Sequence, residues 1–222
     1  MNGLKRIINI FLAPAAVFEE LKTKAGWLLP LSLYLLISLL STYLLLPTVI
    51  IPNQIAMISA NPELTIEQKN AIIAGAGGAT PYITATITAL LLIPLLFLFL
   101  AGLVALIRVV FGGEAFGFKK IFAATCYIGL IGSLGTILTS IIMYAQNIID
   151  AAFNLALLFP GVSGFAGRLL SGINVFGLWQ TALFALLLMA FYQYNRVKAF
   201  SIMFVLYLAW QIVFALLPTG IA

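Results

Sequence analysis

Five long stretches of the chain contain no charged residue. They cover residues 25–62, 70–107, 121–149, 169–195 and 199–222. Each contains an apolar run of about 20 residues, the length that a helix needs to cross the hydrocarbon layer of a membrane. Strands of a membrane barrel would instead alternate apolar and polar positions over ~10 residues. The pattern predicts an all-α polytopic membrane protein with five transmembrane helices, at about residues 28–46, 82–109, 121–144, 175–194 and 200–217.

The segment before the first span has the pattern of amphipathic helices that lie at a membrane surface. Two short apolar stripes recur there at helical spacing, with charged residues between them. The first stripe holds Leu4, Ile7, Ile8, Phe11 and Leu12, with Lys5, Arg6 and Asn9 opposite, and the second holds Val17, Phe18 and Leu21. We therefore divide the chain into an amphipathic cytosolic interfacial segment, residues 1–27, and a membrane domain, residues 28–222.

Three sequence features predict the structure of the connections between the spans. Pro47 and Pro52 are expected to close the first span, because proline disrupts a helix interior. Thr65 followed by Gln68 forms a capping box, which predicts a short helix in the long loop after that span. Residues 151–173 are apolar but broken by polar residues, glycine and proline, so we expect an interfacial or re-entrant helix pair rather than a sixth span.

The positive charges predict the orientation of the protein. With the N-terminus inside, nine of the 11 Lys and Arg residues fall on the inner side, and only Lys69 and Arg168 fall on the outer side. The inner residues are Lys5, Arg6, Lys22, Lys24, Arg108, Lys119, Lys120, Arg196 and Lys198. Because cytoplasmic loops carry an excess of Lys and Arg, five spans give a cytosolic N-terminus and an exoplasmic C-terminus.

Composition narrows the classes of function. The chain is 64% hydrophobic and 8% charged, and its net charge of +5 is explained by the inner-side bias rather than by a nucleic-acid partner. Histidine is absent and the predicted span cores contain no Asp, Glu, Lys or Arg, which argues against ion-coupled transport. No spacing of carboxylates, cysteine or glycine predicts a catalytic, cofactor-binding or metal site. We therefore expect no enzyme and no cofactor.

The third predicted span has the most regular pattern of small and polar residues. Gly129, Gly132 and Gly135 recur every third residue, and Gly132, Thr136 and Ser140 recur every fourth. Small residues let helix backbones approach closely, and hydroxyl groups can form hydrogen bonds between helices. The stripe indicates a tightly packed central helix, with a polar path or an oligomer interface as alternatives. Pro94, inside the second span, indicates a packing kink or a hinge.

An ordered set of short motifs resembles the Yip-type family, the Ypt/Rab-GTPase-interacting membrane proteins and their prokaryotic relatives. The set runs through Arg6–Phe11 with Pro14, Val17–Leu21, Trp27–Pro30, Gly112-Gly113 before Phe118–Phe122, and Asn174–Trp179. The resemblance implies five spans with a cytosolic N-terminus, and for eukaryotic members an adaptor role with prenylated small GTPases. This sequence lacks the long N-terminal region expected to engage such partners. It resembles a prokaryotic member, so the GTPase role is not carried over.

These patterns predict a non-enzymatic scaffold or adaptor of the Yip type in a membrane, which we expect to be the bacterial cytoplasmic (inner) membrane. Its partners are the lipid bilayer, anionic headgroups at the cytosolic face, and a second copy or another membrane protein. The residues expected to contact the membrane surface or a partner are Lys5, Arg6, Lys22, Lys24, Lys119 and Lys120. The alternative is a channel or carrier for an ion or small neutral solute, with a path beside the third span.

Overall fold

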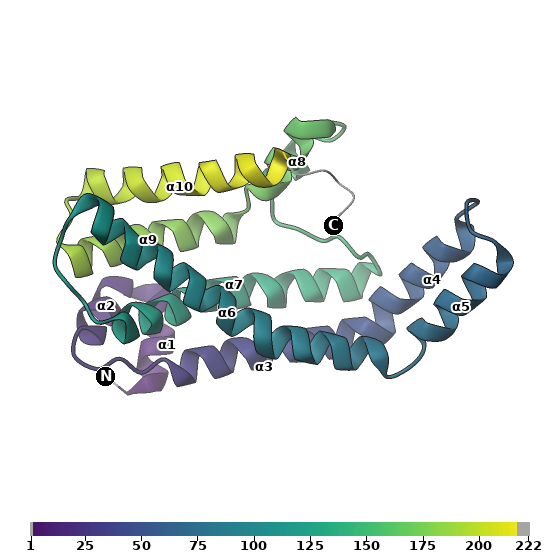
Figure 1. Cartoon of the computed structure of the whole chain (residues 1–222), viewed down its shortest axis with the longest axis horizontal. Coiled ribbons are helices and arrows are strands. Elements are labelled where there is room, and N and C mark those ends of the chain that lie inside the picture. Colours follow the sequence, from purple (N-terminus) through teal and green to yellow (C-terminus); the bar gives the residue numbers. More distant parts are fainter. Residues whose placement is uncertain (1, 217–222) are drawn as a thin grey trace. The chain divides into compact units, whose positions relative to one another are not determined.

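The computed structural model describes residues 2–216 and is built from helices (Figure 1). The α-helices are α1 Gly3–Leu12, α2 Pro14–Leu21, α3 Leu28–Leu45, α4 Ile51–Ala60, α5 Ile66–Ala76, α6 Thr80–Phe111, α7 Phe118–Gln146, α8 Gly164–Gly172, α9 Val175–Tyr192 and α10 Arg196–Leu216. A π-helical turn, η1 Leu46–Ile50, joins α3 to α4, and a 3-10 turn, η2 Leu155–Leu158, lies before α8. Five helical stretches within the described residues are long and apolar enough to cross a membrane, as predicted.

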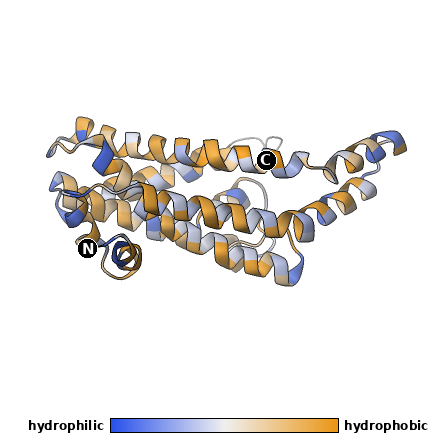
Figure 2. Cartoon of the chain, turned by 90° about the horizontal axis from the view of Figure 1, so that it is seen from below, coloured by the Kyte–Doolittle hydropathy of each residue, from blue (hydrophilic) through white to orange (hydrophobic). Residues whose placement is uncertain are grey.

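The chain forms two compact units. Unit 1 contains residues 1–32, 96–132 and 152–222, and unit 2 contains residues 33–95 and 133–151. The long helices α3, α6 and α7 each contribute residues to both units. Apolar residues dominate along these helices, and polar residues gather toward the ends of elements (Figure 2).

Unit 1 has the first half of α7 at its centre. Every residue from Ile121 to Ile131 is buried, so this stretch is covered on all sides, as expected for a helix that is apolar all round. The helical hairpin of α1 and α2 belongs to the same unit and packs on α9. Val17, Phe18 and Leu21 of α2 are fully buried.

Unit 2 corrects the expected end of the first span. Pro47 and Pro52 do not close the helix, because η1 carries it from α3 into α4 and makes one stretch of 33 residues, Leu28–Ala60. Pro47 lies in η1 and Pro52 at the beginning of α4, and a local π-helical adjustment of this kind accommodates proline within a membrane helix. The predicted capping box is present: the Thr65 hydroxyl accepts from the Gln68 N–H at 3.3 Å, and the Gln68 side chain accepts from the Thr65 N–H at 2.9 Å.

The segment predicted as an interfacial or re-entrant helix pair contains one 3-10 turn, η2, and one nine-residue helix, α8. An isolated antiparallel bridge joins Asn154 to Asn174 and closes the loop that contains both. Neither η2 nor α8 is long enough to cross a membrane. The prediction that this segment is not a sixth span agrees with these lengths.

Helix α10 begins four residues before the predicted start of the fifth span, at Arg196 rather than Phe200. The Asn195 side chain accepts from the Lys198 N–H at 2.8 Å and caps this earlier start. The two basic residues of the α9–α10 connection therefore lie in the first turn of a helix. The predicted end of this span at residue 217 and the predicted exoplasmic C-terminus lie outside the described residues.

Candidate functional site

The α1–α2 hairpin is held together by a buried arginine. Arg6 is only 6% exposed, although the sequence places it on the polar side of α1. Its guanidinium donates to the Glu20 carboxylate at 2.8 Å and to the Lys24 carbonyl at 3.0 Å. Arg6 therefore joins α1, α2 and the following loop, and its placement is interior rather than on the membrane-facing surface.

The same contacts shift the acidity of both side chains. The hydrogen bond from Arg6 is the largest cause that lowers the pKa of Glu20 to about 2, and the bond to Glu20 raises the pKa of Arg6. A carboxylate that accepts a hydrogen bond from a nearby cation is stabilised in its charged form. Both groups are therefore charged at neutral pH and neutralise each other.

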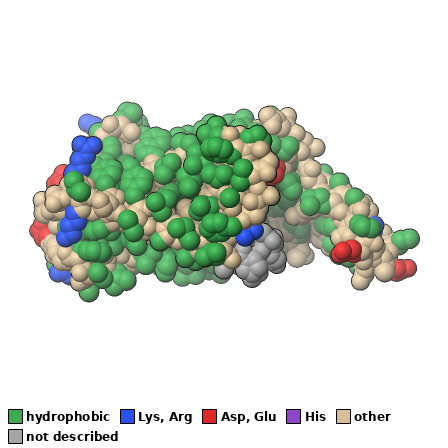
Figure 3. Space-filling model, turned by 90° about the horizontal axis from the view of Figure 1, so that it is seen from above, with side chains coloured by type: hydrophobic (Ala, Val, Ile, Leu, Met, Phe, Trp, Pro, Cys, Tyr) green, Lys and Arg blue, Asp and Glu red, His purple; other side chains and the backbone are tan. Residues whose placement is uncertain are grey.

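The other predicted surface lysines differ in what they contact. Lys22 donates to Glu19 at 2.7 Å in an ion pair between neighbouring turns. Lys5, Lys24 and Lys119 are exposed, and Lys120 lies 5.7 Å from the centroid of the Phe116 ring. Within residues 2–216 no carboxylate forms an ion pair with any of these four lysines. Basic side chains gather at the end of unit 1 that carries the N-terminal helices (Figure 3).

A second polar cluster, which we call the glycine–tyrosine knot, fixes the C-terminal end of α6. It comprises Arg108, Gly112, Gly113, Tyr192, Tyr194 and Lys198. The Tyr194 hydroxyl donates to the Gly112 carbonyl, and the Tyr192 hydroxyl donates to the Val104 carbonyl at 3.0 Å. Burial raises the pKa of Tyr194, so this phenol keeps the proton that it donates.

Lys198 completes the knot. Its Nζ donates to the Phe111 carbonyl at 2.9 Å and lies 4.0 Å from the centroid of the Tyr194 ring. A cation at the last carbonyl groups of a helix satisfies an acceptor that has no partner within the helix and opposes the helix dipole. Sequence reasoning noted Gly112-Gly113 and Lys198 separately, and only the fold brings them together.

Gly113 is required in the knot for two reasons. Its φ is +124°, and a Cβ there would lie 3.0 Å from Tyr192 Cβ and 3.1 Å from the Tyr192 carbonyl oxygen. Residues with a side chain are strained in this part of backbone space. The glycine pair is therefore explained by the turn and by its close approach to the α9–α10 connection.

The small-residue stripe of α7 lies on the most buried of the five candidate spans. A Cβ on Gly129 would collide with the Phe97 ring of α6, so this glycine permits close contact between α6 and α7 inside unit 1. Gly135 and Ser140 are buried, whereas Gly132 and Thr136 are half-buried. Pro94 lies inside α6 and does not end it. The contact between Gly129 and Phe97 is of the kind that the packing interpretation predicts, and the polar path and the oligomer interface stay alternatives for the stripe.

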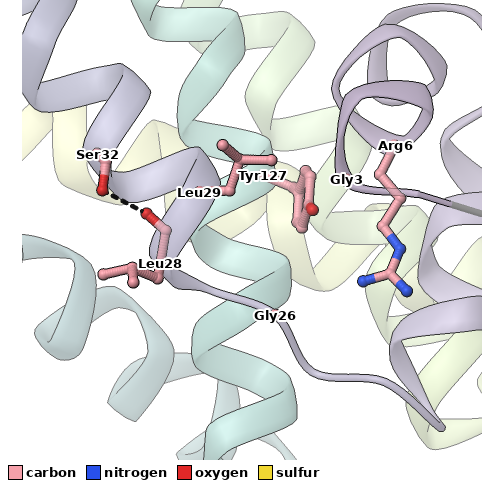
Figure 4. Close-up of a pocket in the computed structure, with 7 residues that line it drawn as sticks. All are labelled: Gly3, Arg6, Gly26, Leu28, Leu29, Ser32 and Tyr127. Atoms are coloured by element: carbon pink, nitrogen blue, oxygen red, sulfur yellow. Dashed lines mark hydrogen bonds between the residues drawn. The ribbon is translucent and has the colours of Figure 1, made fainter.

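A shallow groove of about 400 Å³ lies beside α1 and the beginning of α3 in unit 1. It is lined by Gly3, Arg6, Gly26, Leu28, Leu29, Ser32 and Tyr127. The Tyr127 ring points from α7 toward Arg6, and Leu28 and Leu29 form the wall on the α3 side (Figure 4). Trp27 lies beside the groove with its ring 5.5 Å from Phe122. Sequence reasoning missed the groove, because its lining comes from three separate segments of the chain.

Comparison with known proteins identifies the family. The Yip1 domain matches residues 8–217, nearly the whole chain. The chain belongs to the Yip1 domain family. No curated protein and no solved structure gives a significant match. The Yip1 family consists of non-catalytic membrane proteins, and the described residues of this Yip1 domain contain no cluster of three His, Cys, Asp or Glu side chains that could hold a metal ion.

Proposed function

We propose that this Yip1 domain is a non-enzymatic membrane scaffold or adaptor. It acts through the end of unit 1 that carries the N-terminal helices α1 and α2. The observation that carries the proposal is a set of cationic side chains that form no ion pair with a carboxylate within residues 2–216: Lys5, Lys24, Lys119, Lys120 and the exposed Arg196. We call this set the basic rim. A rim of this kind attracts anionic lipid headgroups, at about 1 kcal/mol for each basic residue near the surface.

The packing of unit 1 supports a binding role. The backbone that carries Lys5, Lys24 and Arg196 is held in place by the Arg6–Glu20 pair and by the glycine–tyrosine knot. A backbone that is already ordered loses less conformational entropy when it meets a partner. We propose that the rim lies on the cytosolic side, that the membrane is the bacterial cytoplasmic membrane, and that the bound partner is anionic lipid or the acidic surface of a membrane protein.

Anionic-lipid preference in nanodiscs tests this function. The protein is reconstituted in nanodiscs that contain increasing fractions of phosphatidylglycerol. The lipid that stays bound when the protein is released from the disc is identified by native mass spectrometry. Replacing Lys5, Lys24, Lys119 and Lys120 by Gln is expected to abolish the preference for phosphatidylglycerol. The control replaces Lys69 by Gln, since this basic residue lies outside the predicted inner segments, and this protein should retain the preference. Equal preference in both proteins would overturn the proposal.

Orientation is tested separately with single cysteines. A cysteine in place of Lys24 should react with an impermeant maleimide only from the cytosolic side of a cell or vesicle, and one in place of Glu63 only from the other side. The opposite pattern would place the basic rim outside and remove the cytosolic part of the proposal.

A further inference from the structure

Helix α1 presents an apolar stripe that no part of the described chain covers. Leu4, Ile8 and Leu12 are spaced four residues apart, and they are 66%, 51% and 78% exposed. Arg6 and Ile10 occupy the side of α1 that is buried in unit 1. Because residues four apart lie on one side of a helix, the three exposed side chains form one surface.

The beginning of α3 fixes where this stripe lies. A Cβ on Gly3 would come within 2.5 Å of Leu29 Cδ2, so α1 touches the first turn of α3. Leu28 and Leu29 are themselves exposed and begin a candidate membrane span. The first turn of a span lies where the headgroups meet the hydrocarbon. Because α1 contacts this turn, α1 is expected to lie at the same boundary between headgroups and hydrocarbon.

Exposed apolar side chains of α3 lie near α1. Leu28 and Leu29 line the groove beside Gly3 of α1, and both are exposed. Lys5, on the flank of the stripe, is exposed as well. An apolar stripe with a basic flank is typical of helices that lie in the plane of a membrane interface.

We propose that α1 is an in-plane membrane anchor, with Leu4, Ile8 and Leu12 inserted among the acyl chains of the leaflet next to the basic rim. This deepens the proposed function and rests on it only in placing the N-terminal helices at a membrane surface. Neutral lipid suffices for the insertion, because the stripe carries no charge. A second copy or a partner helix on the stripe would instead shield it from lipid.

Fluorescence quenching of a label on α1 tests the proposal. Cys126 is replaced by Ala, and single cysteines replace Ile8, Leu12 or Lys5 in separate proteins that carry a bimane label. Each is placed in nanodiscs of neutral phosphatidylcholine, one protein in each disc. Brominated phosphatidylcholine quenches a label among acyl chains, and iodide quenches a label in water. Leu12 is highly exposed, so its replacement removes no protein packing.

The expected result is a ratio of lipid to iodide quenching several-fold higher for Ile8→Cys and Leu12→Cys than for Lys5→Cys. Equal iodide quenching at all three positions would overturn the anchor, since the stripe would then face water. Protection of the stripe labels from both quenchers would also overturn it and indicate protein cover. Discs of neutral lipid remove electrostatic attraction, so failure here is distinct from a failed preference for phosphatidylglycerol.

Discussion

Replacing Glu20 by Gln tests whether the α1–α2 hairpin depends on its interior ion pair. The substitution keeps the size of the side chain but removes the charge that Arg6 contacts at 2.8 Å. Arg6 then remains buried with its charge uncompensated. The matched control is Glu19→Gln, because Glu19 is the next residue and forms its own ion pair with Lys22 at 2.7 Å, but its side chain is 59% exposed.

The structure gives different magnitudes for the two substitutions. A hydrogen bond to a charged group contributes about 1.5–3 kcal/mol, and a charge left unpaired in a buried place adds to the loss. The exposed pair between Glu19 and Lys22 contributes about 0–0.5 kcal/mol. Since 1.4 kcal/mol corresponds to a factor of about ten, Glu20→Gln should open the hairpin one to two orders of magnitude more often. Glu19→Gln should change opening by less than about threefold.

Hydrogen–deuterium exchange of the α1 and α2 amides in nanodiscs measures this opening. Faster exchange confined to these helices in Glu20→Gln, with little change in Glu19→Gln, is the expected result. The reasoning is refuted if both variants exchange alike, or if the exchange of α1 and α2 is unaffected by either.

The protection of the α1 and α2 amides against exchange should also depend on pH, which provides a second test of the ion pair. The folded pKa of Glu20, about 2, lies below the ordinary value of 4.5 for a glutamate carboxyl group, so the unfolded hairpin binds a proton more readily than the folded one. The stabilisation is therefore fully present above pH 4.5 and is lost as the pH falls toward 2. After correction for intrinsic exchange rates, protection should stay constant from pH 8 to 5 and decrease below that window. A loss between pH 7 and 5 would contradict the assignment.

Three further substitutions or reactions test other contacts. Gly113→Ala should destabilise the protein by about 1–3 kcal/mol, because its positive φ and the nearby Tyr192 leave no room for a methyl group. Thermal unfolding in detergent measures this loss of stability. A change below about 0.5 kcal/mol would contradict the argument. Lys198→Met should speed exchange at the C-terminal end of α6, whereas Lys119→Met, at an exposed lysine outside the knot, should not. Cys126 is fully buried and should resist maleimide in folded protein but react in denaturing detergent; fast labelling of folded protein would contradict the packing of α7.

Sequence reasoning predicted the spans well because membrane crossing depends on the length and polarity of a continuous segment. It was wrong about Pro47 and Pro52, because a proline can either end a helix or be accommodated inside one by a local π-helical turn such as η1. Only the backbone path distinguishes the two cases. The start of α10 was missed for a similar reason, because the polar residues there indicated a loop although Asn195 caps the helix.

The candidate site was less accessible to sequence reasoning. The apolar spacing in α1 predicted a surface helix, but it gave no indication that Arg6 would turn inward, because its partner is 14 residues away in the sequence. Gly112 and Gly113 could be recognised as a turn. Their contacts with Tyr192 and Tyr194, however, span about eighty residues and require the packing of α6 on α9. Long-range partners of this kind leave no local periodicity.

The basic residues that determine the topology are not all available to bind a partner. Nine basic residues on the inner segments predict the topology, because orientation depends on the total of Lys and Arg near the span ends. After folding, Arg6 and Lys22 are paired with carboxylates, while Arg108 and Lys198 donate to backbone carbonyls near the end of α6. The basic rim therefore comprises five residues, not nine. Substituting a residue such as Lys198 tests the fold, whereas substituting a residue such as Lys119 tests recognition, and a study that combined them would confuse loss of structure with loss of binding.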